Sequence, residues 1–302
     1  MIAIISHDAG GAEILSSYVR QQGIDSFYVL EGPARKIFER KLGPIETTPL
    51  EEAIRQSASI ICGTSWQSDI ELNAIKLARS QGKRSVAFLD HWVNYHDRFV
   101  RADRLILPDE IWVGDAMAEK IAKEIFSSLT VTIVDNPYVQ DIREELAAIE
   151  TPRLPDPDHI SILYVCEPVS EHALLRHGDA HFWGYVEEDA LRYFLSNSYA
   201  LGKPIERILI RPHPSERPEK YSWAQHEFSL HIEMGGTRTL LEEVVESDWV
   251  VGCESMAMVV ALLAEKKVIS CIPPGGRPCV LPHTEIASLH DFLERKTSFL
   301  GD

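Results

Sequence analysis

The side chains best suited to chemistry lie in the last third of the chain, just after two apolar stretches. Arg211 and His213 follow the first stretch, and Glu254 and Ser255 follow the second. Because the carboxyl ends of parallel strands meet at one edge of a sheet, where ligands bind, we expect these side chains to lie close together. A guanidinium, an imidazole, a hydroxyl and a helix N-terminus suit a phosphate-like anion. The residues predicted to bind it are Arg211, His213, Pro214, Glu254, Ser255 and Met256.

A second group of polar residues follows the first apolar stretch of the chain, Ile2–Ser6. His7 and Asp8 come directly after it, and Gly10 and Gly11 allow a tight strand-to-helix turn with close backbone approach. The glycine spacing is not GxGxxG, so a dinucleotide fingerprint is not supported. Asp8, helped or replaced by His7, is a candidate general base. The alternative is a polar turn that only caps the following helix.

A third polar segment, residues 90–97, follows another apolar stretch and holds two His, two Asp, one Asn and two aromatic residues. Loops of this composition at the end of a strand tend to carry function. Asp90 and His91 are therefore the alternative acid–base pair. Trp92 and Tyr95 either stack on a ligand or belong to the core, which is the commoner location of aromatic side chains.

The anion site also has simpler interpretations. The prolines on both sides of His213 suit an ordinary surface turn. Ser255 suits a plain N-cap for the helix that follows, because a cap and a bound phosphate use the same N–H groups. Glu242 and Glu243 belong to a predicted helix, and we expect both on its solvated face.

Strand-like and helix-like stretches alternate along the chain, which predicts an α/β fold with parallel sheets. Residues 151–158 contain three prolines and form the best linker. We therefore expect two Rossmann-like domains, residues 1–150 and residues 151–302, that face a central cleft. Closure about the linker would exclude water from that cleft. A closing helix is expected over residues 286–295.

The composition is that of a globular protein, with 45% apolar and 25% charged residues among 302. The formal net charge of −16 argues against a non-specific nucleic-acid binder, but it does not exclude a small anionic ligand in one cleft. The five cysteines show neither CxxC nor zinc spacing, which favours free thiols in a reducing compartment. The N-terminus lacks the basic region of a signal peptide, so a cytoplasmic protein is expected.

Two Rossmann-like units, the Arg-x-His-Pro sequence at 211–214 and the later Glu254-Ser255 together resemble GT-B glycosyltransferases. The motifs are similar to those of bacterial sialyltransferases, polysialyltransferases and CDP-glycerol transferases, which carry a His-Pro motif and a downstream Ser or Thr motif. The resemblance implies that His213 and Ser255 hold the phosphate of a nucleotide-activated donor, often CMP-linked. It also implies an acidic base in the N-terminal domain, where Asp8 to Gly11 loosely matches an acidic-Gly motif.

On this resemblance, the expected activity is transfer of a sugar from a nucleotide-sugar donor to a glycan or lipid-linked acceptor, as in polysaccharide biosynthesis. The donor is expected on the C-terminal domain and the acceptor on the N-terminal domain, near Asp8 and Asp90. Gly275 lies in a loop after the last apolar stretch and either contacts a base or ribose or forms a simple turn. No cofactor is expected, and peripheral membrane association and a homodimer stay open.

A bound metal is not expected, because the one Asp-x-Asp sequence, Asp156-Pro-Asp158, lies in the linker. Arg, His and a helix dipole would then stabilise the charge on the leaving phosphate. Two other activities fit the same architecture. One is a nucleotide-sugar 2-epimerase or hydrolase, and the other is a binding subunit that has lost catalysis.

Overall fold

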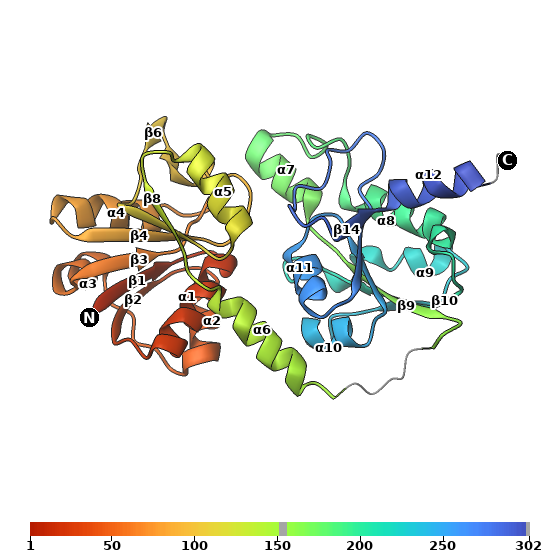
Figure 1. Cartoon of the computed structure of the whole chain (residues 1–302), viewed down its shortest axis with the longest axis horizontal. Coiled ribbons are helices and arrows are strands. Elements are labelled where there is room, and N and C mark those ends of the chain that lie inside the picture. Colours follow the sequence, from red (N-terminus) through yellow and green to blue (C-terminus); the bar gives the residue numbers. More distant parts are fainter. Residues whose placement is uncertain (151–155, 300–302) are drawn as a thin grey trace. The chain divides into compact units, whose positions relative to one another are not determined.

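The computed structural model describes residues 1–150 and 156–299 of the chain. The chain divides into two compact units, Met1–Asp141 and Ile142–Asp302, and each contains a six-stranded parallel sheet covered by helices (Figure 1). The sequence-based prediction of an α/β fold with two parallel-sheet domains is therefore confirmed. The expected boundary at residues 150 and 151 adjoins the segment 151–155, which lies outside the described residues.

The sheet of the first unit has the strand order β2-β1-β3-β4-β7-β8. The chain first moves from β1 to β2 on one side and then returns to β3 on the other side of β1. The carboxyl ends of β1 and β3 therefore form the topological switch point, where ligands bind in sheets of this class. The elements of this unit are β1 (Ile2–Ser6), α1 (Ala9–Gln22), β2 (Ser26–Leu30), α2 (Ala34–Leu42), α3 (Leu50–Gln56), β3 (Ser59–Cys62), α4 (Ile70–Ser80), β4 (Arg84–Leu89), η1 (Asp97–Phe99), β5 (Val100–Arg101), β6 (Arg104–Leu105), β7 (Glu110–Val113), α5 (Ala116–Ile125) and β8 (Thr130–Ile133). The next helix, α6 (Pro137–Ala148), contains the boundary between the two units.

The central strands of this sheet are apolar over most of their length, and helices cover both faces. Ile5, Cys62 and Leu89 pack in one core with the buried faces of α3, α4 and α5. Ile4 and Phe88 point to the other face and pack with α1 and α2. Strands buried on both faces read as continuous apolar runs rather than as an alternation, which is why the sequence shows them clearly.

The second unit repeats this arrangement, with the strand order β11-β10-β9-β12-β13-β14. Here β10 lies on one side of β9 and β12 on the other, so the switch point is at the carboxyl ends of β9 and β12. The elements of this unit are β9 (Ile160–Val165), α7 (Val169–His177), α8 (Glu187–Asn197), η2 (Ser198–Leu201), β10 (Ile205–Arg211), η3 (Pro218–Tyr221), α9 (Ala224–Glu227), β11 (Ile232–Met234), α10 (Leu240–Val245), β12 (Trp249–Gly252), α11 (Met256–Leu263), β13 (Lys267–Ser270), β14 (Ile286–Ser288) and α12 (Leu289–Phe299).

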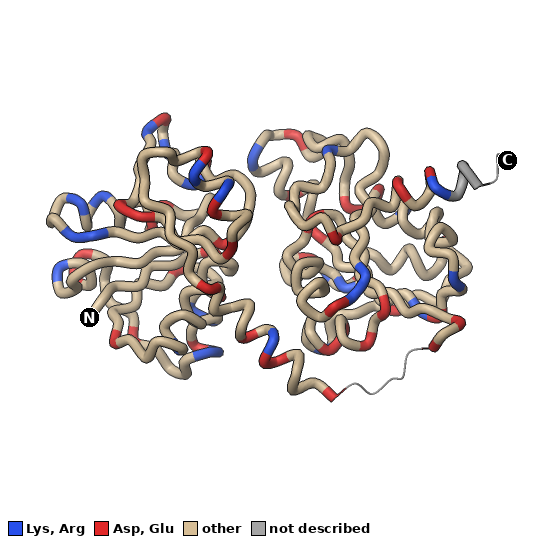
Figure 2. Tube along the Cα trace, in the orientation of Figure 1, with Lys and Arg blue, Asp and Glu red and all other residues tan. Residues whose placement is uncertain are grey.

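The predicted helix over residues 286–295 is partly wrong. Ile286–Ser288 forms the edge strand β14, which pairs in parallel with Val268–Ser270, and α12 begins only at Leu289. A strand of three residues is too short to show a period of its own, so its pairing partner decides its conformation. Acidic and basic residues are interspersed along both units (Figure 2). In residues 1–150 and 156–299, no helix is long and apolar enough to cross a bilayer.

Gly184 brings the segment before α8 into close contact with the loop after β13. Its φ is +84°, and a Cβ at this position would lie 2.3 Å from the carbonyl oxygen of Gly275. The neighbouring Trp183 carbonyl also accepts the N–H of Arg277 at 3.0 Å. The contact requires a residue without a side chain, so the conformation of the Gly275 loop depends on Gly184.

We expect Gly184→Ala to destabilise the second unit more than Gly178→Ala does. Gly178 also has a positive φ, +74°, but a Cβ there meets no atom within 4 Å. Gly178→Ala should therefore lower the free energy of unfolding by about 1 kcal/mol, the cost of the left-handed backbone. Gly184→Ala should lower it by roughly 2 kcal/mol more, because the Gly275 carbonyl must shift. Equal losses in denaturant unfolding would contradict the contact.

Candidate functional site

The structure brings most of the predicted anion-binding residues to the carboxyl edge of three adjacent strands. Arg211 ends β10 and pairs in register with Val165 of β9. On the other side of β9, Glu254 and Ser255 follow β12 and precede α11. This edge contains the switch point of the second sheet, so the predicted residues lie where the topology favours a ligand.

His213 is held in one tautomer by its neighbours. The backbone N–H of Ser215 donates to His213 Nδ1 at 3.2 Å, and Ser215 Oγ lies 2.8 Å from the same nitrogen. A nitrogen that accepts a backbone N–H carries no proton, so the proton of the neutral imidazole is on Nε2. Burial lowers the pKa of His213, and nearby His172 lowers it further. His213 is therefore a neutral Nε2–H donor around neutral pH.

The guanidinium of Arg211 is hydrogen-bonded to other residues of the protein and is not free in solvent. Its Nη1 donates to Glu243 Oε2 at 2.6 Å and to the carbonyl of Arg238 at 3.0 Å. The Glu243 side chain is only 1% exposed and also accepts the N–H of Gly236 at 2.7 Å. A buried carboxylate without a counter-ion would cost several kcal/mol, so Arg211 stabilises the end of β10. The expectation that Glu243 lies on a solvated face is wrong.

The N-terminus of α11 already holds a carboxylate of the protein itself. Glu167 Oε1 accepts the N–H of Glu254 at 2.7 Å and the N–H of Cys253 at 3.1 Å. Burial raises the pKa of Glu167 to about 7, and the like charge of Glu254 acts in the same direction. The Ser255 hydroxyl caps α11 by accepting the N–H of Ala257 at 3.2 Å. Met256 is the first residue of this helix. We predicted that N–H groups at this helix N-terminus bind a phosphate, and in this structure those of Cys253 and Glu254 bind Glu167.

Glu254 and Gly275, both predicted to bind the nucleotide, have different surroundings. Glu254 forms an ion pair with Arg277, whose guanidinium stacks on the ring of Trp183 at 4.4 Å from its centroid. Gly275 lines a cavity of about 390 Å³ near the carboxyl end of β13. Other residues lining this cavity are Ser270, Pro273, Gly276, Ser288 and His290.

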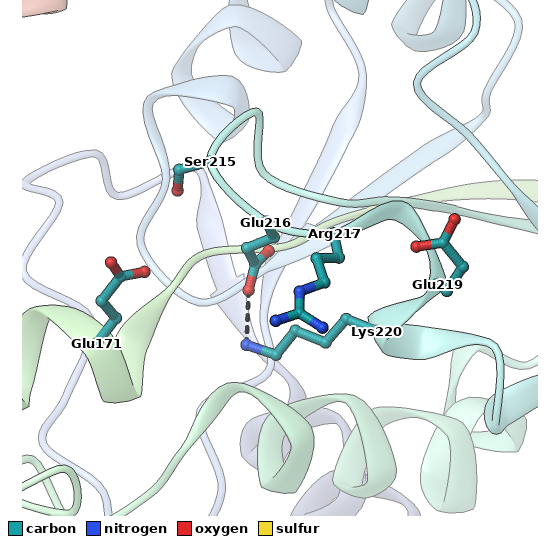
Figure 3. A pocket seen from close by; sticks show the side chains of 6 residues that line it. All are labelled: Glu171, Ser215, Glu216, Arg217, Glu219 and Lys220. Carbon is teal, nitrogen blue, oxygen red and sulfur yellow. Dashed lines mark hydrogen bonds and ion pairs between the residues drawn. The ribbon is translucent and has the colours of Figure 1, made fainter.

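A second cavity, of about 540 Å³, opens next to the His213 loop (Figure 3). It is lined by Glu171, Ser215, Glu216, Arg217, Glu219 and Lys220. Ser215, which contacts the His213 ring, therefore also lines this cavity. The side chains of Glu216 and Lys220 point toward each other and form an ion pair of 2.8 Å.

In the first unit, the Asp8 side chain contacts His7 and the hydroxyl of Ser65, which follows the neighbouring strand β3. Asp8 Oδ1 lies 2.7 Å from His7 Nδ1 and accepts the Ser65 hydroxyl at 2.7 Å. Asp8 occupies the N-cap position of α1, but its side chain makes no capping hydrogen bond. The alternative that the turn only caps the helix is therefore wrong for the Asp8 side chain. These residues lie at the carboxyl ends of β1 and β3, which form the switch point of the first sheet.

Asp90 lies against the first turn of α1. A Cβ on Gly10 would be 1.9 Å from Asp90 Oδ2, so this approach requires glycine. A Cβ on Gly11 would be 3.2 Å from the Cα of Gly63, and Gly11 thus lets α1 approach the end of β3. Asp90 forms an ion pair with Arg98, which also donates to the Thr64 hydroxyl at 2.6 Å. The structure therefore brings Asp90 into the same strand-end cluster as Asp8.

The aromatic residues of the 90–97 loop pack in or against the core of the first unit. Tyr95 is 1% exposed and belongs to the core of the first unit, which excludes stacking on a ligand. Trp92 packs against that core, and its Nε1 donates to Asp115 Oδ2 at 2.9 Å. The ring of His91 packs edge-on against Trp92, with 5.5 Å between the centroids. The loop therefore contributes Asp90 to the site, while its aromatic residues anchor it.

Sequence reasoning missed a buried carboxylate that holds the His7 backbone. Glu71, in the first turn of α4, is 2% exposed, and its Oε1 accepts the N–H of His7 at 2.8 Å. Burial raises the pKa of Glu71 to about 7. In the sequence this residue looks like an ordinary acidic residue in a first helical turn. Glu167 was missed as well, although it follows the apolar run 160–166. Because ligands bind at the carboxyl ends of parallel strands, that position could have identified it.

We expect Glu71→Gln to change how the stability of the first unit depends on pH. In the folded protein Glu71 titrates near pH 7, whereas an unfolded glutamate titrates near about 4.3. Between these values the folded state binds more protons, so wild-type stability falls as pH rises. The glutamine keeps an oxygen for the His7 N–H and does not ionise. The variant should therefore gain stability relative to wild type, by roughly 3 kcal/mol between pH 4 and pH 8.

Urea unfolding at several pH values measures this difference. Glu51→Gln, at an exposed position of α3, is the matched control and should not show the gain. A difference between Glu71→Gln and wild type that is constant across pH 4 to pH 8 would contradict the buried titration.

Comparisons with known proteins agree on the architecture. No family model and no curated sequence matches this chain. Among solved structures, a putative UDP-N-acetylglucosamine 2-epimerase from Listeria monocytogenes matches with a TM-score of 0.55 and 11% identity, over 99% of this chain and 88% of that one. The glycotransferase of kitacinnamycin matches with a TM-score of 0.53 and 10% identity, over 100% of this chain and 90% of that one.

An α/β-galactoside α-2,3-sialyltransferase from Photobacterium phosphoreum also matches, with a TM-score of 0.49 and 8% identity, over 96% of this chain and 98% of that one. At these identities the likeness shows the fold alone. The chain thus has the fold that its motifs led us to expect, the two Rossmann-like units of GT-B glycosyltransferases.

Proposed function

We propose that this protein is a glycosyltransferase that uses a nucleotide-activated sugar, with the nucleotide phosphate bound by the second unit. The observation that carries the proposal is the fixed tautomer of His213, an Nε2–H donor at the carboxyl edge that contains the switch point. The leaving phosphate gains negative charge in the transition state, so a donor already in place stabilises it most there. A neutral imidazole provides this hydrogen bond without a metal ion.

The N-terminus of α11 is the second anion-binding element in the proposal. Glu167 shows that the N–H groups of Cys253 and Glu254 bind a carboxylate, and a phosphate oxygen has similar acceptor geometry. The donor phosphate would displace Glu167, while Ser255 and Met256 keep α11 in position. Arg211 enters the proposal only as support for the end of β10, because it already neutralises Glu243.

The first unit supplies the general base in this proposal. Among the described residues, His7 and Ser65 both bond to Asp8 Oδ1, and we assign Oδ2 to the hydroxyl of a glycan or lipid-linked acceptor. Asp90 is the alternative base, but its carboxylate already forms an ion pair with Arg98. We therefore assign the base to Asp8 and a positioning role to His7.

The nucleotide site is tested by binding. We expect one of CMP, CDP, UDP, GDP or their sugars to raise the melting temperature of the protein, and calorimetry to give its affinity. His213→Ala should weaken that nucleotide at least tenfold, because a hydrogen bond to a charged group contributes about 1.5–3 kcal/mol. His226→Ala, an exposed histidine in the same unit, is the control and should bind as wild type does. Equal affinity in the His213 and His226 variants would refute the phosphate role.

Product analysis with the bound nucleotide sugar separates transfer from its alternatives. Transfer requires that the sugar appear on an acceptor. Release of free sugar without an acceptor would indicate a hydrolase, and conversion at carbon 2 of the donor sugar would indicate an epimerase. Binding without turnover of any donor would indicate a binding subunit.

The overlap between Glu167 and the donor phosphate predicts a pH-dependent effect of Glu167→Gln. Above pH 7 Glu167 is mostly ionised, so it competes for the N–H groups and repels the phosphate. We expect the variant to bind the nucleotide about tenfold more tightly than wild type at pH 8, which is about 1.4 kcal/mol. At pH 6 the protonated Glu167 no longer repels the phosphate, and the affinity ratio should shrink toward one. Weaker binding by the variant at both pH values would show that Glu167 supports the site.

A further inference from the structure

Glu216 joins the His213 loop to the rest of the second unit. Its side chain is 3% exposed, and both of its oxygens accept hydrogen bonds. Oε2 accepts the N–H of His213 at 3.0 Å, while Oε1 accepts the hydroxyl of Tyr221 at 2.7 Å and the ammonium of Lys220 at 2.8 Å. The residues on both sides of His213 are prolines, which have no N–H. The His213 N–H is therefore the one backbone donor of this Pro-His-Pro turn, and Glu216 binds it.

Lys220 extends this contact to two helices. Besides Glu216, it forms an ion pair with Glu187, whose side chain is 6% exposed. Glu187 in turn accepts the N–H and the hydroxyl of Ser170, both at 2.8 Å. Ser170 lies in the first turn of α7, just after β9, and Glu187 begins α8. The Pro-His-Pro turn is thus fixed, through three charged side chains, to the elements beside the switch point.

The geometry points to Glu216 as the residue that positions the His213 imidazole for the donor phosphate. This inference rests on the function proposed for His213 above. Glu216 fixes the backbone of His213, and Ser215 fixes its Nδ1, so the direction of Nε2–H is determined from both ends. Glu216 is buried and bonded on both oxygens, and it acts through His213 rather than on the ligand.

Acceptor oxygens are required on both sides of this carboxyl group, because its three hydrogen-bond partners among the described residues are all donors. The backbone N–H of His213, the hydroxyl of Tyr221 and the ammonium of Lys220 all donate to Glu216, so its oxygens act as acceptors in all three hydrogen bonds. A glutamine would place an NH₂ group against one of these donors. Loss of the charge would also leave Lys220 with one carboxylate instead of two. The charged and titratable groups near the imidazole are Glu216, His172 and Glu171.

The test is Glu216→Gln, with Glu219→Gln as the matched control. Glu219 is an exposed glutamate of the same segment and lines the same cavity (Figure 3). The first measurement is the affinity for the nucleotide found in the screen, and Glu216→Gln should weaken it about tenfold while Glu219→Gln leaves it unchanged. The second is an NMR pH titration of the His213 ring in the protein without ligand, with the resonance assigned by its absence in His213→Ala.

The direction of the titration separates positioning from a simple charge effect. Burial is the main cause of the lowered pKa of His213, whereas the charge of Glu216 raises it. If Glu216 positions the loop, its loss exposes the ring, and the pKa of His213 should rise toward its ordinary value. A further fall would mean that only the charge was removed and the loop stayed in place, which overturns the inference. Unchanged affinity and titration would overturn it as well.

Tyr221→Phe is a milder second variant in case Glu216→Gln does not fold. It removes one hydrogen bond to Glu216 and preserves volume and charge at a fully buried position. We expect it to weaken the nucleotide a few-fold and to move the His213 titration in the same direction as Glu216→Gln; no change in either would contradict the inference. If the wild type binds no nucleotide, the proposed function fails, but the His213 titration still decides the role of Glu216.

Discussion

Backbone N–H groups that emerge at the carboxyl edges of the two sheets are bound by side-chain carboxylates of the protein itself. Glu71 binds the N–H of His7, Glu216 binds that of His213, and Glu167 binds those before α11. Where a strand ends, the backbone N–H groups no longer pair with the neighbouring strands. A buried N–H without another acceptor would destabilise the fold. These carboxylates let the chain turn sharply at the places where the candidate site residues lie.

The three carboxylates differ in how their charge is compensated. Glu216 forms an ion pair with Lys220 and holds the His213 turn through the His213 N–H. Glu71 and Glu167 rely on backbone N–H groups, and burial raises the pKa of each to about 7. Near neutral pH, Glu71 and Glu167 are therefore close to their titration points. A carboxylate close to its titration point gives up its N–H partners at lower cost, which is consistent with the proposal that a donor phosphate displaces Glu167.

Much of the architecture follows from the order of residues. Apolar runs such as Ile2–Ser6 and Ile160–Val165 are buried on both faces, so they identify parallel strands without any tertiary information. Polar residues just after such runs indicated the strand ends, and His213 and Asp8 do lie there. The edge strand β14 could not be predicted, because three half-buried residues acquire a strand conformation only from their pairing with β13.

The sequence by itself therefore determined the α/β class, the two sheets and the residue types at the strand ends. Tertiary structure decided which of these side chains remain available for a ligand. Arg211 is not available because it forms an ion pair with Glu243, which lies on α10. Tyr95 is not available because it is buried in the core of the first unit. The N–H groups before α11 are occupied because Glu167, more than eighty residues earlier, lies at the end of the adjacent strand. Local periodicity reports which face of an element is buried, but the partner of a polar group comes from another element, and only packing brings the two together.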